Sequence, residues 1–267
     1  MKRPELRRPL DLLLLLLTLL ASGSAQASDG TLEINQTCAV HTGCFPGDAA
    51  GFPVTITVPG SYVLTSNLVQ NEVPLVSTPM TAIEIASRSV TVDFAGFEIT
   101  CRNPLGGLCN GSAAGIEQAT SFVEAVTIVG GTIRQMPGYG IDLRGADYIT
   151  VRDMHIVRNG GRGISIRDGA NVSGNNVHAN AEFGIHVGFG LVRDNVVVGN
   201  QDTGIVSVGA AHVIGNTILG NINYGVNLGA GSLRNNLIRG NGTGSVVLGT
   251  GAIDAGGNAC NETTTCP

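Results

Sequence analysis

The sequence contains no tryptophan, only 4% of its 267 residues are aromatic, and only 13% are charged. Lysine occurs once, at Lys2, and the net charge at pH 7 is −5. This balance argues against a nucleic acid or an anionic membrane surface as the partner. Helical periodicity is also lacking: no stretch after the N-terminal segment repeats apolar residues every ~3.6 positions between capping residues. Short runs rich in Val, Ile and Thr, separated by Gly, Asn and Asp, predict strands instead.

The N-terminal segment is typical of a secretory signal peptide. A basic start, MKRPELRRPLD, precedes the apolar run LLLLLLTLLA, and AQA at residues 25–27 fits a small-residue cleavage site. The apolar run is too short to span a membrane. We therefore expect residues 1–27 to be a signal peptide and residues 28–267 to form a single domain that is secreted or periplasmic.

The six cysteines fall into three close pairs in the sequence. In an exported protein disulfides are expected, and proximity favours the local pairings. The first and last pairs bracket the expected domain and are placed to cap its ends. The pairs are Cys38/Cys44, Cys101/Cys109 and Cys260/Cys266.

A repeat of 20 or 21 residues runs through the second half of the chain. Asparagine and Gly-Ile or Gly-Val pairs recur in fixed columns, and a repeat of this length indicates a solenoid. The aliphatic anchors are Val151, Val172, Val192, Val213 and Leu233; one asparagine column holds Asn175, Asn195, Asn216 and Asn236; the second holds Asn159, Asn180, Asn200, Asn221 and Asn241.

Each repeat carries three short aliphatic segments, which predicts a parallel β-helix with three strands per turn and eight or nine turns. The aliphatic columns are expected inside. Asparagine tolerates the left-handed backbone of a tight corner, and its amide can bond to the equivalent asparagine one turn away. A leucine-rich repeat also carries asparagine at a similar period, but it needs leucine in columns that here hold Val, Ile and Gly.

The segments VTITVPGSYVLTSNLV, SVTVDFAGFEI and VTIVGGTI, with the later Asn-containing turns, resemble secreted bacterial right-handed parallel β-helix repeat proteins of the pectate-lyase-like superfamily. The resemblance implies an all-β, single-stranded right-handed parallel β-helix and action on a polysaccharide. The D-P-H-E block of mannuronan epimerases and the motifs of polygalacturonases and pectate lyases are absent. No catalytic residue is carried over, and whether the protein is an enzyme stays open.

In the Gly-Ile strands, side chains alternate inward and outward. The outward residues of successive turns should lie about 5 Å apart, which gathers three carboxylates that can attract a cation such as Ca²⁺. Arg144 and Arg167 follow two places after members of this line. In order, the line is Glu84, Glu117, Asp142, Ser165, His186, Val206, Asn227 and Val247.

These residues suggest a site for an acidic polysaccharide. An arginine can neutralise the carboxylate of a uronate, and a histidine close by can take the proton from its C5 position, giving elimination or epimerisation. The candidate catalytic residues are Asp142, His186 and Arg167. The candidate substrate-binding residues are Glu84, Glu117, Ser165 and Arg144, with Tyr139 and Phe183 as stacking platforms for sugar rings. The loop at residues 101–115 is expected to wall the cleft.

One other interpretation remains. Polar ladders are common on the solvated faces of β-helices, so the protein can be a non-catalytic structural or adhesive module. In that case an outward apolar patch at Val196, Val198, Leu219 and Leu237 would favour self-association.

Overall fold

The computed structural model describes residues 30–71, 80–103, 109–119, 123–261 and 266. The chain divides into two compact units, Met1–Gly30 and Thr31–Pro267, and the second unit contains every strand described below. The predicted signal peptide at residues 1–27 lies outside the described residues and stays a prediction. Within the described part of the chain, no helix is both long enough and apolar enough to cross a bilayer.

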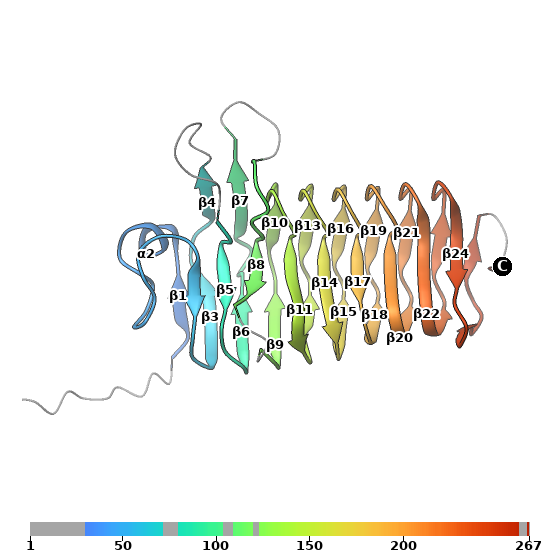
Figure 1. Ribbon diagram of the computed structural model, residues 1–267, viewed down its shortest axis with the longest axis horizontal. Helices are drawn as coiled ribbons and strands as arrows, with labels where there is room; N and C mark the ends of the chain where they lie inside the picture. The colour runs from blue at the N-terminus through green and yellow to red at the C-terminus, as the bar shows by residue number, and fades with distance from the viewer. Residues whose placement is uncertain (1–29, 72–79, 104–108, 120–122, 262–265, 267) are drawn as a thin grey trace, which may run out of the picture. The chain divides into compact units, whose positions relative to one another are not determined.

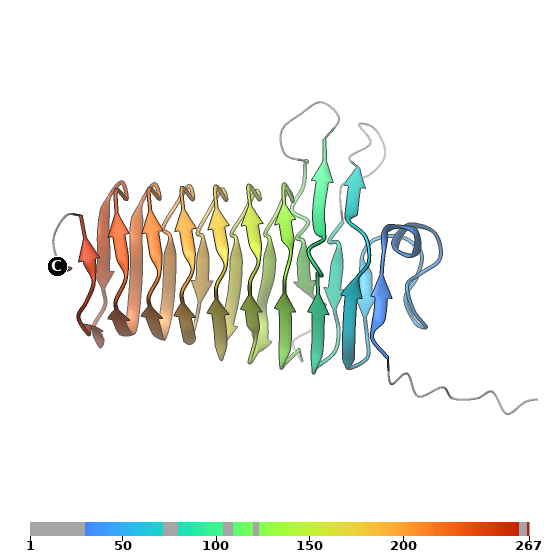
Figure 2. The ribbon, with the colours of Figure 1, turned by 180° about the vertical axis from the view of Figure 1, so that it is seen from behind.

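The second unit is a parallel β-solenoid, whose coils are stacked in chain order (Figures 1 and 2). A nine-stranded sheet consists of β4 (Leu68–Asn71), β7 (Glu98–Arg102), β10 (Thr132–Arg134), β13 (His155–Val157), β16 (Asn176–His178), β19 (Val196–Val198), β21 (Thr217–Leu219), β23 (Leu237–Arg239) and β26 (Ala259–Cys260). The number of coils is close to the eight or nine predicted.

The other strands form a 17-stranded sheet, which supplies two strand positions to a coil. Its members are β1 (Leu32–Ile34), β2 (Val54–Ile56), β3 (Gly60–Leu64), β5 (Ile83–Ile85), β6 (Val90–Asp93), β8 (Ile116–Gln118), β9 (Val126–Val129), β11 (Ile141–Asp147), β12 (Thr150–Arg152), β14 (Ile164–Asp168), β15 (Ala170–Ser173), β17 (Ile185–Val187), β18 (Gly190–Arg193), β20 (Ile205–Ile214), β22 (Tyr224–Arg234), β24 (Gly244–Leu248) and β25 (Ala252–Asp254).

The aliphatic columns of the repeat form the core, as predicted. The anchors pair in register from Val151 to Val172, Val192, Val213 and Leu233, and all five are fully buried. Since one coil cannot bury this apolar face alone, each coil depends on its neighbours for stability.

Both asparagine columns form buried hydrogen-bonded ladders. The side-chain amide of Asn195 donates to Oδ1 of Asn216 at 3.0 Å, and the backbone N–H of Asn195 donates to the same oxygen at 2.9 Å. In the second ladder Asn200 bonds to Asn221 in the same way, at 3.0 Å and 3.0 Å. Oδ1 of each asparagine therefore accepts hydrogen bonds from the backbone N–H and the side-chain amide of the asparagine one coil earlier, so these buried donors are paired.

The left-handed corner residue is not the ladder asparagine, which corrects one detail of the prediction. Positive φ falls on the residue before it, as at Asp194 (φ 56°) and Gly215 (φ 70°). The corner is turned by this preceding residue, so the asparagine side chain points inward. Asparagine is needed at these columns for its amide rather than for its backbone.

The glycine before each aliphatic strand is explained by the second ladder. A Cβ on Gly204 would lie 2.7 Å from Nδ2 of Asn221 in the next coil and 2.7 Å from the carbonyl oxygen of Gly225. These contacts are too close, so the glycine column and the asparagine column require one another.

The N-terminal end carries one short helix, α2 (Gln36–His41), which the sequence pattern does not reveal. It has six residues, too few for an apolar period, and it begins at Asn35, whose side chain accepts a hydrogen bond from the backbone N–H of Cys38. The three predicted disulfides are present, and they are compatible with export: Cys38–Cys44, Cys101–Cys109 and Cys260–Cys266.

Candidate functional site

The outward line of side chains runs in unbroken register along the 17-stranded sheet, and we call it the outward ladder. Its members pair in the order Glu84, Glu117, Asp142, Ser165, His186, Val206, Asn227 and Val247. Exposure varies along it: Ser165 is fully buried, although alternation points its side chain outward. Arg162 and His186 cover this hydroxyl, as described below.

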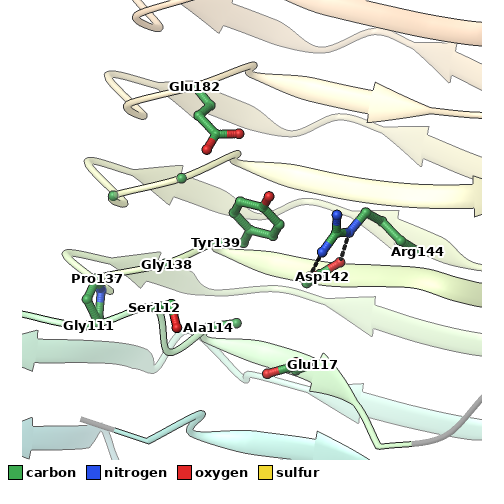
Figure 3. Close-up of a pocket in the computed structure, with 12 residues that line it drawn as sticks. Gly111, Ser112, Ala114, Glu117, Pro137, Gly138, Tyr139, Asp142, Arg144 and Glu182 are labelled. Carbon is green, nitrogen blue, oxygen red and sulfur yellow. Dashed lines mark hydrogen bonds and ion pairs between the residues drawn. The ribbon is translucent and has the colours of Figure 1, made fainter. Parts of the chain in front are cut away.

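A cavity of about 420 Å³ opens beside the N-terminal half of the outward ladder, and we call it the site cavity. Its charged and aromatic lining side chains come from three coils: Glu117 from β8, Tyr139, Asp142 and Arg144 from β11 and the turn before it, and Glu182 from the turn before β17 (Figure 3). Glycines 138, 160 and 161 form part of the wall. The ring of Tyr139 fills the space over Gly161, where a Cβ would meet the ring at 2.1 Å.

The described part of the loop at residues 101–115 contributes to the cavity, as expected. Gly111, Ser112 and Ala114 line it. Residues 104–108 of that loop lie outside the described residues.

Asp142 and Arg144, which both line the cavity, form an ion pair with two hydrogen bonds. Nε of Arg144 donates to Oδ1 of Asp142 at 2.8 Å and Nη2 donates to Oδ2 at 2.8 Å. The Asp142 carboxylate raises the pKa of Arg144 further above its usual value through these hydrogen bonds. The Arg144 guanidinium carbon also lies 5.1 Å from the centre of the Tyr139 ring. Asp142 therefore holds a cation in place against an aromatic face.

Arg162 is the residue of this site that the sequence interpretation missed. Its guanidinium lies 5.6 Å from the Tyr139 ring centre and 5.0 Å from that of Phe183, and it pairs with Glu182 at 3.2 Å. A signal was present in the sequence. Tyr139 and Phe183 each precede the glycine of their turn, and Arg162 holds the same position in the turn between them.

His186 is neutral at pH 7 in this environment. Burial, followed by the positive charges of Arg162 and Arg144, lowers the pKa of His186 to about 4. Nδ1 of His186 lies 3.2 Å from Nη1 of Arg162 and 3.3 Å from Oγ of Ser165. Because an arginine N–H can only donate, Nδ1 must accept, and we assign the ring proton of His186 to Nε2.

Arg167 and Phe183, which were predicted to belong to the site, do not line the site cavity. Arg167 pairs with Asp168 at 3.1 Å and with Asp147 at 3.6 Å. The ring of Phe183 lies against His186, with centroids 6.0 Å apart, and not across the cavity. Arg162, and not Arg167, lies beside His186.

The carboxylates at the N-terminal end of the ladder bind hydroxyl groups. Thr81 donates to Oε2 of Glu117 at 2.7 Å, and Thr55 lies 3.5 Å from Oε2 of Glu84. Within the described part of the chain, no three His, Cys, Asp or Glu side chains are grouped so as to hold a metal ion. Asp142 pairs with Arg144, and binding of Ca²⁺ along the outward ladder stays a prediction.

The apolar patch on the nine-stranded sheet faces outward as alternation predicts. Val196 is 42% exposed and Leu237 38% exposed, and both pair in register with Thr217. Self-association through this patch stays a prediction.

The chain is similar to several solved structures. The A-module of the mannuronan C-5 epimerase from Azotobacter vinelandii is 17% identical over 82% of this chain and 70% of that chain, with a TM-score of 0.50. A periplasmic alginate epimerase is 13% identical over 83% of this chain and 70% of that chain, with a TM-score of 0.46. The Dettilon tailspike protein is 14% identical over 74% of this chain and 57% of that chain, with a TM-score of 0.38.

Comparison with curated proteins gives no match. A family model described as "Right handed beta helix region" matches residues 81–221 and 114–260, which together span more than half of the chain. This protein therefore belongs to the right-handed β-helix family.

Proposed function

We propose that this protein binds a uronate-containing polysaccharide in the site cavity. The observation that carries the proposal is the pair of guanidinium groups that flank one aromatic ring, Arg144 and Arg162 around Tyr139. Planar guanidinium groups recognise carboxylates through paired hydrogen bonds, and a tyrosine face can pack on the apolar face of a sugar. The similarity in fold to an epimerase that acts on a mannuronan agrees with this class of ligand.

The residues beside the cavity also suggest a reaction at the uronate. A carboxylate that bonds to Arg162 would compete with Nδ1 of His186 for the guanidinium. Once released, the Nδ1 lone pair can accept the C5 proton, and the electron pair passes into the carboxylate that the arginines neutralise. Return of a proton from water on the opposite face gives the C5 epimer. Breakage of the C4–O bond instead gives a C4–C5 double bond, and the leaving oxygen takes up a proton from water to become the new chain end.

In this scheme Asp142 acts as a positioning residue, because it holds Arg144 through two hydrogen bonds. Glu182 does the same for Arg162. Arg167 has no part in the scheme, because it pairs with Asp168 and Asp147 and does not line the cavity. We also propose that the protein acts outside the cytoplasm, in the periplasm or beyond the cell, where its three disulfides can form.

The proposal is tested with the purified chain and a panel of polyuronates, with and without Ca²⁺. Binding is measured by calorimetry, elimination by ultraviolet absorbance of unsaturated products, and epimerisation by exchange of the C5 proton in D₂O. We expect binding that is weakened in Arg162→Gln and unchanged in Arg152→Gln, which alters an exposed arginine of another column that pairs with Asp153. Absence of binding to every uronate polymer would overturn the proposal and favour the structural or adhesive alternative.

A further inference from the structure

Charge is distributed unevenly along the outward ladder. The two arginines of the site lie on adjacent coils, Arg144 on β11 and Arg162 just before β14. The two coils before them carry carboxylates at the ladder position instead, Glu117 on β8 and Glu84 on β5. Among the described residues, no arginine forms an ion pair with either glutamate.

The arginines are already matched by carboxylates of the protein. Asp142 neutralises Arg144 and Glu182 neutralises Arg162. Glu117, which also lines the site cavity, therefore adds a negative charge with no counterpart there. The two arginines thus lie on adjacent coils, and the excess of negative charge lies on the two coils before them.

The spacing of the coils relates this pattern to a glycan chain. Stacked strands lie ~4.8 Å apart, close to the length of one pyranose residue, so a glycan along the ladder places successive sugars over successive coils. A homopolymer of uronate held at the arginines would then carry its next carboxylates over Glu117 and Glu84. These like charges would lie well within the screening distance of ~8–10 Å at ordinary ionic strength, and they would repel.

Uncharged sugars fit the same two coils. Carboxylates accept hydrogen bonds from hydroxyl groups, and both glutamates already accept, or lie close to, a threonine hydroxyl: Glu117 at 2.7 Å from Thr81 and Glu84 at 3.5 Å from Thr55. The hydroxyls of a neutral sugar are the same kind of donor.

We infer that the site selects a heteropolysaccharide in which one uronate, held by Arg144 and Arg162, is followed by uncharged sugar over Glu117 and Glu84, and that it discriminates against homopolyuronates. This inference rests on the proposed function and defines its substrate class.

The test compares three glycan probes of equal length in low salt with a chelator present: an oligosaccharide in which each glucuronate alternates with a pair of uncharged sugars (the alternating probe), a polymannuronate oligosaccharide and an uncharged glucan. We expect the alternating probe to bind about tenfold more tightly than the homopolymer, because each misplaced carboxylate meets a like charge. In the double variant Glu84→Gln/Glu117→Gln, homopolymer affinity should rise about tenfold, while that for the alternating probe changes less than about threefold. Glu33→Gln, which removes a carboxylate from a different column, should leave the ratio unchanged.

The outcomes separate the two proposals. Equal or tighter binding of the homopolymer, or an unchanged ratio in the folded double variant, overturns the charge inference and leaves uronate binding intact. If the uncharged glucan binds as tightly as the alternating probe, then the arginines do not contribute to recognition of the glycan and the proposed function is overturned. Binding of none of the probes overturns the proposed function and this inference together. Thermal melting of each variant identifies loss of folding. If the double variant does not fold, binding of the alternating probe to Arg162→Gln still tests whether this arginine holds the uronate.

Discussion

Nη1 of Arg162 lies 3.2 Å from Nδ1 of His186 and closes a contact between two adjacent coils. The same guanidinium reaches Oε2 of Glu182 and Oγ of Ser165, at 3.2 Å and 3.4 Å. Arg162 therefore connects the aromatic part of the site to the histidine, and a ligand that binds Arg162 also changes what His186 can do.

Replacing Arg162 with glutamine should weaken binding of a uronate oligosaccharide by about 10- to 100-fold, since a hydrogen bond to a charged group contributes about 1.5–3 kcal/mol. Calorimetric titration measures the change. Arg193→Gln is a matched control, because Arg193 is exposed and pairs with its neighbour Asp194 at 3.0 Å. Equal losses in both variants would show that the effect is one of net charge and not of this site.

His186 should titrate well below an ordinary histidine. Burial and two neighbouring arginines lower its pKa to about 4, opposed in part by Asp142. The resonance of its ring protons should therefore shift at a midpoint near pH 4 in an NMR titration. Arg162→Gln should move that midpoint upward, because it removes one of the positive charges. A midpoint unchanged in this variant would contradict the electrostatic contribution of Arg162.

The same shift makes folding stability depend on pH in a defined direction. The folded state holds His186 neutral, whereas the unfolded chain takes up a proton near pH 6.5. The stabilising contribution is therefore complete above about pH 6.5 and is lost as pH falls toward 4. Melting temperatures of the native chain and of His186→Gln, compared at pH 7 and pH 5, should show a larger fall for the native chain. An equal fall in the two proteins would mean that other groups control this window.

Removing one asparagine from the middle of a ladder should destabilise the whole solenoid. Asn200 donates to Asn221 Oδ1 and the Val177 carbonyl and accepts from the backbone and side chain of Asn180. Asn200→Ala leaves these buried groups unpaired, at about 2–5 kcal/mol in the free energy of unfolding. Denaturant unfolding measures this change. Asn223→Ala, on an exposed corner where the side chain bonds to Asp202, should lose less than about 1 kcal/mol.

The repeat allows the fold to be predicted from the sequence. Register, inward columns and the outward ladder all follow once Val172, Val192 and Val213 are aligned, because stacking converts a spacing of 20 or 21 residues into contact. Helix α2 is not accessible in this way, since it lies before the first repeat and depends on the local cap at Asn35.

The site can be predicted from the sequence only in part. Alignment places Glu117, Asp142 and His186 on one line, but it does not give the direction of long side chains. Arg167 is adjacent to the ladder in sequence and turns to Asp168, whereas Arg162 reaches the site across Ser165 from a turn. The direction of each arginine side chain depends on which carboxylates lie within its reach. Those distances are set by the packing of the coils and cannot be read from the alignment.

The dependence of the glycine column on the asparagine ladder leads to a last prediction. In Gly204→Ala the new methyl group would meet the Asn221 amide and the Gly225 carbonyl, both at 2.7 Å. The backbone atoms on one side and the hydrogen-bonded ladder on the other leave no room for the methyl group. We therefore expect a loss of about 2–4 kcal/mol in the free energy of unfolding, which is typical of overpacking in a core. Gly244→Ala is the control, because its nearest contact would be the Tyr224 ring at an ordinary 3.5 Å. If the double variant Gly204→Ala/Asn221→Ala is no more stable than expected from the sum of the single changes, then the two columns are not coupled and the steric explanation fails.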